Sequence, residues 1–371
     1  MICPCSLIHI DLFKPLRDTF SMIRKKWTLH ILLPAIVPLL LSWPLLSQPR
    51  PSRLPSCKIG QHFPGVWEKL SDDSHQVGLG WPCCGWDNRD WERFKDCGNA
   101  TSGVEGISGN GPAFTPNDSY AKVGGHGCSC DANMISARWV PKHCELKSWD
   151  KVTFCTLLRN RKMLFIGDST MQQTAATVMN AVYGKCHRSM AFGISDTLVG
   201  RSFGAMNRGK SWSVWVQEFN PDIVVLSTGA HIHNFTDFSS VLHEVYGNFS
   251  LFANTTFIWK TQNPGGCDSK MQSELNNEFW QNYSGHGDVK RFGWDEFLDR
   301  DVHAIQFFSR TPVPILDVRP LYMRTDAHPG SYPDTATYRD CLHFCCHSKG
   351  PLHLIPILLH HTLMEFDHLN A

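Results

Sequence analysis

The chain has 371 residues, of which 42% are hydrophobic, so it can form one large or two ordinary domains with a substantial core. Its 35 basic and 34 acidic residues give a formal net charge of +1, without long runs of one sign. This balance argues against a nucleic-acid-binding surface, and we expect no nucleic-acid partner.

The first apolar segment, residues 27–46, reads WTLHILLPAIVPLLLSWPLL and contains no charged residue. A membrane-spanning helix needs about 20 such residues. Arg24, Lys25 and Lys26 precede it, so the positive-inside rule places residues 1–26 in the cytoplasm and the rest of the chain in a lumen. A cleaved signal peptide is the alternative, but the leader is long and no clear cleavage site follows. The sequence predicts a single-pass type II membrane anchor, with secretion as the alternative.

Cysteines and glycosylation motifs concentrate after this segment. Thirteen of the 15 cysteines follow it. So do six Asn-x-Ser/Thr sequons, which begin at Asn99, Asn117, Asn234, Asn248, Asn254 and Asn282. Both features are typical of an oxidising lumen, so we expect disulfides and glycans in this part of the chain.

A stem rich in Pro and Ser, residues 47–56, leads into a lumenal domain at residues 57–371. Residues 57–150 are dense in Trp, Gly and Cys with little periodicity, which predicts a loop-rich subregion held by disulfides. The alternative is a zinc site formed by Cys83, Cys84, Cys128 and Cys130. Cys-x-x-Cys pairs are absent from this set, so we expect no bound metal.

Residues 151–371 instead alternate short apolar runs with turns or helical stretches. The runs with the length and composition of buried strands are KMLFIG (162–167), DIVVLST (222–228), TTFIWK (255–260) and VPILDV (313–318). Residues 169–183 have a helical pattern, and residues 351–366 form a core or surface helix too short for a second membrane span. Strands alternating with helices predict an α/β fold with a parallel sheet covered on both faces, and functional groups gather at the carboxyl ends of such strands.

Gly167, Asp168 and Ser169 stand where the first of these strands ends and a helix begins. This position exposes the Ser169 hydroxyl beside backbone N–H groups and the positive helix end, which suits a developing oxyanion. Ser and Asp are also preferred N-cap residues. On this motif alone, a plain helix cap is the favoured interpretation.

A nucleophilic serine needs a base, and the base usually needs an orienting acid. The segment YRDCLHFCC places Asp340 three residues before His343, on one side of a helical turn. The carboxylate can then fix the imidazole tautomer while the other ring nitrogen faces the serine. A structural histidine is the alternative, and a metal site in HFCCH is disfavoured because its residues are too crowded for tetrahedral coordination.

Two more glycine-containing loops, STGAHIHN and KTQNPGGCD, follow predicted strands. Gly229 can bring a backbone N–H to the oxyanion. Asn234 can donate from its side chain, although it begins a sequon and a glycosylated residue is a poor donor. His231 and His233 as metal ligands are a weaker alternative.

The order of these motifs, GDS early and Asp-x-x-His near the end, resembles the SGNH (GDSL-type) hydrolase superfamily. Within it, the chain resembles the PC-esterase group that includes the plant trichome-birefringence-like polysaccharide O-acetyltransferases. The resemblance covers about residues 57–366, unevenly. PGVWEKL, RWVPKHCELKSW and NPGGCD are similar to the group's Gly-x-Trp, Trp-x-Pro-x-x-Cys-x-Leu and Gly-Gly-x-Cys segments. The most specific similarity is LYMRTDAHPGSY followed by YRDCLHFC, which matches Asp-x-His-Pro and Asp-Cys-x-His-Trp-Cys with Phe344 in place of Trp.

The resemblance implies an SGNH-like three-layer α/β/α fold with a catalytic triad. Ser169 is the implied nucleophile, His343 the general base and acid, and Asp340 the orienting carboxylate. Asp326 and His328 match the Asp-x-His-Pro segment and are expected to be structural or pocket residues. Ser227 stands where the plant members have an Asn, so this block does not identify an oxyanion donor.

The resemblance also implies disulfides. A bond between Cys267 and Cys341 would tie the Gly-Gly-Cys loop to the triad segment. Cys345 would then be available to connect the same turn to the N-terminal subregion. Cys144, in the segment similar to Trp-x-Pro-x-x-Cys-x-Leu, is a further candidate for disulfide formation.

The implied activity is transfer of an acetyl group to a carbohydrate hydroxyl through an acetyl-serine. It requires an acetyl donor, acetyl-CoA or another carrier, and no bound cofactor. Water as the acceptor would make the same machinery a carbohydrate acetylesterase, and a non-catalytic glycan-binding protein is a third reading. The expected location is the Golgi membrane, with the catalytic domain in the lumen. The sequence does not predict an oligomeric state.

Overall fold

The computed structural model describes residues 54–58, 64–70, 137–182, 185–204, 207–266, 293–328, 341–344 and 350–369. All of them belong to one compact unit, Arg53–Ala371. The predicted membrane segment, the four candidate zinc ligands and the sequons at Asn99, Asn117 and Asn282 lie outside the described residues. Within those residues, no helix is both long and apolar enough to cross a bilayer.

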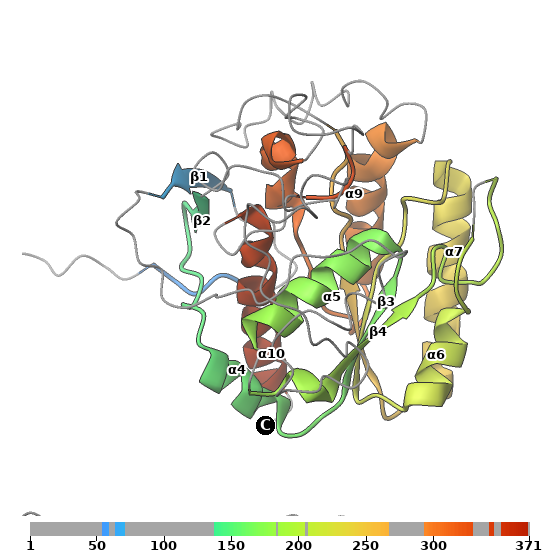
Figure 1. Ribbon diagram of the computed structural model, residues 1–371, viewed down its shortest axis with the longest axis horizontal. Coiled ribbons are helices and arrows are strands. Elements are labelled where there is room, and N and C mark those ends of the chain that lie inside the picture. Colours follow the sequence, from blue (N-terminus) through green and yellow to red (C-terminus); the bar gives the residue numbers. More distant parts are fainter. Residues whose placement is uncertain are drawn as a thin grey trace, which may run out of the picture. The chain divides into compact units, whose positions relative to one another are not determined.

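A five-stranded parallel sheet in the order β4-β3-β5-β6-β7 forms the centre of the fold (Figure 1). Its strands are β3 (Met163–Gly167), β4 (Met190–Ile194), β5 (Ile223–Leu226), β6 (Thr256–Lys260) and β7 (Ile315–Leu316). The predicted parallel sheet is therefore confirmed, and four strands lie within the predicted runs. The exception is β4, a partly exposed strand that pairs with β3 at the edge of the described sheet; its short MAFGI segment is not among the predicted runs.

Alternating side chains of the central strands enter two different cores. Met163 and Phe165 of β3 face one core, whereas Leu164 and Ile166 face the other. Three helices cover the first face: α4 (Lys151–Leu158), α5 (Ser169–Ala181) and α10 (Leu354–Leu369). Three cover the second: α6 (Trp212–Phe219), α7 (Phe235–Gly247) and α9 (Phe297–Phe308). Figure 1 shows these two helical layers on either side of the sheet. The predicted C-terminal helix is thus a core helix.

The N-terminal subregion contains regular structure that its composition did not predict. β1 (Gly65–Lys69) and β2 (Ala137–Pro141) form a two-stranded antiparallel sheet in which Trp67 lies opposite Trp139. The indole N–H of Trp67 donates to the carbonyl of Pro320 at 2.9 Å, and both tryptophans join the first core. The segments GVWEK and ARWVP lack the strict alternation of apolar and polar residues that indicates a half-buried strand.

Two disulfides lie among the described residues. Cys57 pairs with Cys144, which confirms that Cys144 forms a disulfide. Cys155 of α4 pairs with Cys186, a bond that the sequence did not indicate. The described 3₁₀ helices are η2 (His187–Ser189), η3 (Phe249–Phe252), η5 (Trp294–Glu296), η6 (Arg319–Ala327) and η8 (Pro351–His353).

Candidate active site

Ser169 is the first residue of α5, directly after the carboxyl end of β3. Gly167 is required at this turn because a Cβ there would lie 2.3 Å from the carbonyl oxygen of Ser227. The N-cap is Asp168, whose Oδ1 accepts hydrogen bonds from the backbone N–H of Thr170 (2.9 Å) and its hydroxyl (2.7 Å). The interpretation of Ser169 as the cap is therefore wrong, because its neighbour performs that role.

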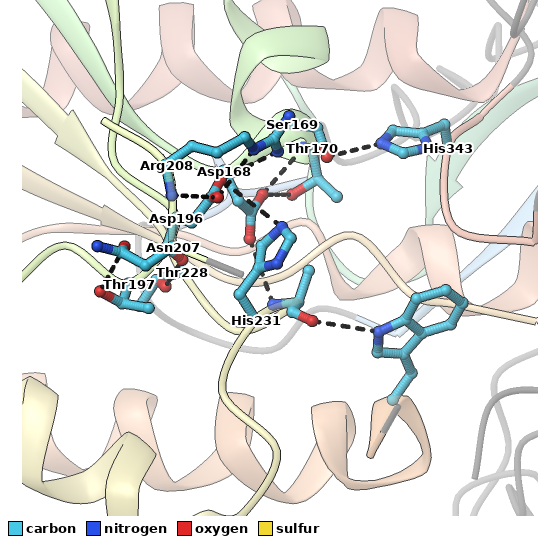
Figure 2. Close-up of polar contacts among 12 residues, drawn as sticks. Asp168, Ser169, Thr170, Asp196, Thr197, Asn207, Arg208, Thr228, His231 and His343 are labelled. Atoms are coloured by element: carbon cyan, nitrogen blue, oxygen red, sulfur yellow. Dashed lines mark hydrogen bonds and ion pairs between the residues drawn. The ribbon is translucent and has the colours of Figure 1, made fainter. Parts of the chain in front are cut away.

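His343 meets this serine from the other end of the chain. Its Nε2 lies 2.8 Å from the Ser169 Oγ, across 174 residues of sequence (Figure 2). The serine is 4% exposed and the histidine 7%, so Ser169 is buried rather than exposed as its position in the sequence suggested. The structure thus brings together two of the three predicted triad residues in hydrogen-bonding geometry.

The third predicted triad residue, Asp340, lies outside the described residues, and its role stays a prediction. So do the predicted partners Cys267 and Cys345. Cys341 is disulfide-bonded, and its carbonyl accepts a 2.6 Å hydrogen bond from the N–H of Gly266. This contact brings the Gly-Gly-Cys loop against the triad segment. The pairing of Cys341 with Cys267 stays a prediction.

The backbone beside His343 is anchored to α5 and to the segment after η6. The Gln173 side chain donates to the Phe344 carbonyl at 2.6 Å and accepts from the Phe344 N–H at 3.0 Å. The His328 Nδ1 donates to the His343 carbonyl at 2.9 Å, and its ring packs on Phe344 at 4.3 Å between centroids. Sequence reasoning missed Gln173, although it follows Ser169 by four residues and so lies on the same helix face.

Asp326, the other residue of the Asp-x-His-Pro segment, forms a buried ion pair. Both of its carboxylate oxygens accept from the Arg324 guanidinium, at 2.8 and 3.1 Å. Arg324 also lies over the ring of Trp67, at 5.1 Å from the centroid. These contacts connect η6 to the β1–β2 sheet and give Asp326 a structural role.

The loop after β5 packs against the start of α5. The Ala230 N–H donates to the Asp168 Oδ2 at 3.3 Å, and the Gly229 carbonyl accepts from the Arg300 Nη1 at 3.1 Å. Gly229 has a φ of +156° and is buried. The loop is therefore held beside Ser169, while the oxyanion role of the Gly229 N–H stays a prediction.

Asn234 lies at the surface rather than in the site. Its side-chain oxygen caps α7 by accepting from the Asp237 N–H at 2.8 Å. The proposal that it donates to the oxyanion is wrong for this reason. Asn234, Asn248 and Asn254 are all exposed, a position suited to glycan attachment, which stays a prediction.

A buried carboxylate, Asp196, lies after β4 at the same edge of the sheet. It accepts two hydrogen bonds from the Arg208 side chain, at 2.9 and 3.1 Å, and its Oδ1 is 3.6 Å from the His231 Nε2 (Figure 2). The sequence did not indicate this cluster. In the described part of the chain, no group of three or more His, Cys, Asp or Glu side chains is arranged to hold a metal, and this includes His231 and His233.

Two buried charged residues, Lys260 and Asp301, contact the loop that follows β6. Burial lowers the pKa of Lys260 to about 8 and raises that of Asp301 to about 7. The Lys260 Nζ donates to the Thr261 carbonyl at 2.8 Å. Asp301 accepts from the Gln262 N–H at 2.8 Å and from the Tyr322 hydroxyl at 2.9 Å. Protein groups therefore hold both side chains in place.

A scan of family models and a search of curated proteins found no match to this chain. Similar solved structures include an acetyl xylan esterase, with 13% identity and a TM-score of 0.34 over 53% of this chain and 98% of the esterase. They also include a GDSL-like lipase from Bacteroides thetaiotaomicron VPI-5482, with 11% identity and a TM-score of 0.31 over 57% of this chain and 90% of the lipase. At these identities and TM-scores the similarity does not support a functional assignment. The function proposed below rests on the geometry of the site and on the sequence motifs.

Proposed function

We propose that this protein is an acyl-transfer enzyme in which Ser169 is the nucleophile and His343 the general base. The observation that carries the proposal is the 2.8 Å contact between the Ser169 Oγ and the His343 Nε2. At this distance the imidazole can take the hydroxyl proton directly. A plain capping role for the serine does not explain the contact, because Asp168 already caps the helix.

The reaction begins when the His343 Nε2 accepts the Ser169 proton and the Oγ attacks the carbonyl carbon of an acetyl donor. Negative charge then develops on the former carbonyl oxygen. The proposed stabilising group is the backbone N–H of Ser169, which belongs to the first residue of α5, at the positive end of the helix. His343 returns the proton to the leaving group, and an acetyl-serine remains.

In the second half of the reaction, His343 deprotonates an acceptor hydroxyl, which attacks the carbonyl carbon of the acetyl-serine. The bond from that carbon to the Ser169 Oγ breaks, and His343 returns the proton to the Oγ. The motif resemblance supports an acetyl group as cargo and a carbohydrate as acceptor. A water acceptor would give an acetylesterase by the same steps. Asp340 is proposed to orient the His343 ring from its other nitrogen. The type II anchor and Golgi location remain predictions of the sequence.

The test uses the purified full-length protein and 4-nitrophenyl acetate as the donor. Wild type should release 4-nitrophenolate and gain one acetyl group on the peptide that contains Ser169, as read by mass spectrometry. Ser169→Ala should reduce release by about 10³-fold or more. Ser213→Ala, a partly buried serine of α6, is the matched control and should retain the rate. Equal rates for wild type and Ser169→Ala would refute the assignment.

Adding neutral methyl glycosides separates the two acceptors. A transferase produces acetylated glycoside at the expense of free acetate. An esterase releases acetate at the same rate whether or not the glycoside is present.

A further inference from the structure

The loop after β6 carries two buried side-chain amides that lack hydrogen-bond partners. Gln262 is 3% exposed and Asn263 is fully buried. Neither the nitrogen nor the oxygen of either amide has a partner among the residues that the structure describes. Burying an amide without partners is unfavourable, and native proteins rarely retain such groups without a reason. A molecule that enters this place from outside the chain would satisfy them.

Gln262 lies beside the proposed site. Its amide packs on Gly229, where an added Cβ would lie 1.7 Å from the Gln262 Oε1. Ala230, the next residue of that loop, donates to Asp168, the neighbour of Ser169. β6 is two strands from β3 in the sheet. Two strand spacings are about 10 Å, a span that a carbohydrate of one or two rings can bridge.

The loop also has a defined chemical character. The Gln262 N–H donates to Asp301, whose other oxygen accepts from Tyr322, and Lys260 donates to the Thr261 carbonyl. Other protein groups therefore hydrogen-bond to the charged side chains of Lys260 and Asp301. The Gln262 side chain itself is an uncharged amide. An amide offers both donors and an acceptor, and so do neighbouring hydroxyls of a sugar. The amide therefore matches a neutral polyhydroxyl ligand better than an ion.

We propose that Gln262 binds hydroxyl groups of the carbohydrate acceptor, with Asn263 adding a second amide in the same loop. This inference rests on the proposed acyl-transfer function and deepens it by identifying an acceptor-binding residue. Reaction with the donor should not depend on Gln262, because attack on 4-nitrophenyl acetate uses Ser169 and His343 and needs no carbohydrate acceptor.

The experiment compares full-length wild type, Gln262→Met and Gln217→Met. Gln217 is an exposed residue of α6 and controls for the substitution itself. Acceptor KM is measured with methyl glycosides of glucose, galactose and xylose, and donor reactivity from 4-nitrophenolate release without acceptor. Gln262→Met should raise the acceptor KM about tenfold, the effect of one lost hydrogen bond, and leave release within about twofold. Its Tm should equal or exceed that of wild type, because an unsatisfied buried amide is removed.

A second measurement does not depend on turnover. In Ser169→Ala protein, the same glycosides at high concentration should raise the Tm, and adding Gln262→Met should abolish this rise. The inference is overturned if Gln262→Met changes neither the acceptor KM nor the glycoside-dependent Tm. It is also overturned if Gln262→Met lowers the Tm with no change in KM, since Gln262 would then hold an internal water. Failure of the proposed function looks different, because wild type itself would release no 4-nitrophenolate.

Discussion

Gln173 of α5 forms two hydrogen bonds with Phe344, the residue after His343. The Gln173 side chain donates to the Phe344 carbonyl and accepts from the Phe344 N–H. Ser169 lies on the same helix, one turn earlier. A single helix therefore carries the proposed nucleophile and also holds the segment that carries its proposed base. The distance between the Ser169 Oγ and the His343 Nε2 depends on this connection as well as on the two residues themselves.

Gln173→Leu should lower kcat about 10²-fold with little change in KM, because a shift of about 1 Å in a reacting group costs this much. It should also reduce stability by about 1–3 kcal/mol, since two backbone groups of Phe344 lose their partners. The kinetics are measured with 4-nitrophenyl acetate on protein whose fold is checked by circular dichroism. Thr177→Val is the matched control: it removes a buried hydrogen bond one turn further along α5 without touching Phe344. A folded Gln173→Leu protein with wild-type kcat would contradict this role.

Asp340 and Asp326 should respond differently to the same substitution. Asp340→Asn should reduce acetyl release by about 10³-fold or more, because a neutral amide no longer holds the required imidazole tautomer. Asp326→Asn should instead lower stability by about 3–5 kcal/mol, because it breaks the buried pair with Arg324. Release rates and urea unfolding of both variants provide the comparison. If the effects are exchanged, Asp326 rather than Asp340 acts with His343.

His353 should make the fold less stable in acid. Burial lowers its pKa from the usual 6.5 to about 4, and its Nδ1 donates to the Gly350 carbonyl. The unfolded chain therefore binds a proton on this histidine at a higher pH than the folded chain does. Stability from this residue is complete above pH 6.5 and falls by about 3 kcal/mol as the pH drops to about 4.

The measurement is the free energy of unfolding in urea at pH 7 and at pH 4.5. His353→Gln, which keeps a donor for the Gly350 carbonyl, should lose less stability between the two values than wild type does. His143→Gln, at an exposed position, should behave like wild type. A wild-type pH dependence in the His353→Gln protein would exclude this histidine as the cause.

The Cys155–Cys186 disulfide should stabilise the fold without contributing to the chemistry. It closes a loop with a sequence separation of 31, for which chain entropy predicts about 4 kcal/mol. The double variant Cys155→Ala/Cys186→Ala should lose about this much free energy of unfolding, measured in urea. Its rate of 4-nitrophenolate release should stay within about twofold at a temperature where it is folded. A large loss of rate in the folded variant would show that this bond also positions the site.

The sequence by itself determined the elements whose signals are local. Buried apolar runs predicted β3, β5, β6 and β7, because burial on both faces leaves a continuous apolar pattern. The helical pattern after Gly167 predicted α5, and motif order selected Ser169 and His343. These signals lie in the composition of short segments and in the order of motifs along the chain, so they can be read before the fold is known.

Only the tertiary structure decided which segments distant in the sequence contact one another. It placed His343 against Ser169, gave the capping role to Asp168, and joined Gln173 to Phe344. It also paired β1 with β2 across the cysteine-rich subregion and set Gln262 against Gly229. No local pattern encodes these contacts, because each depends on how the helices and loops pack around the sheet. The physical reason is that propensity and burial act within a few residues, whereas side-chain complementarity acts between segments that meet only after folding.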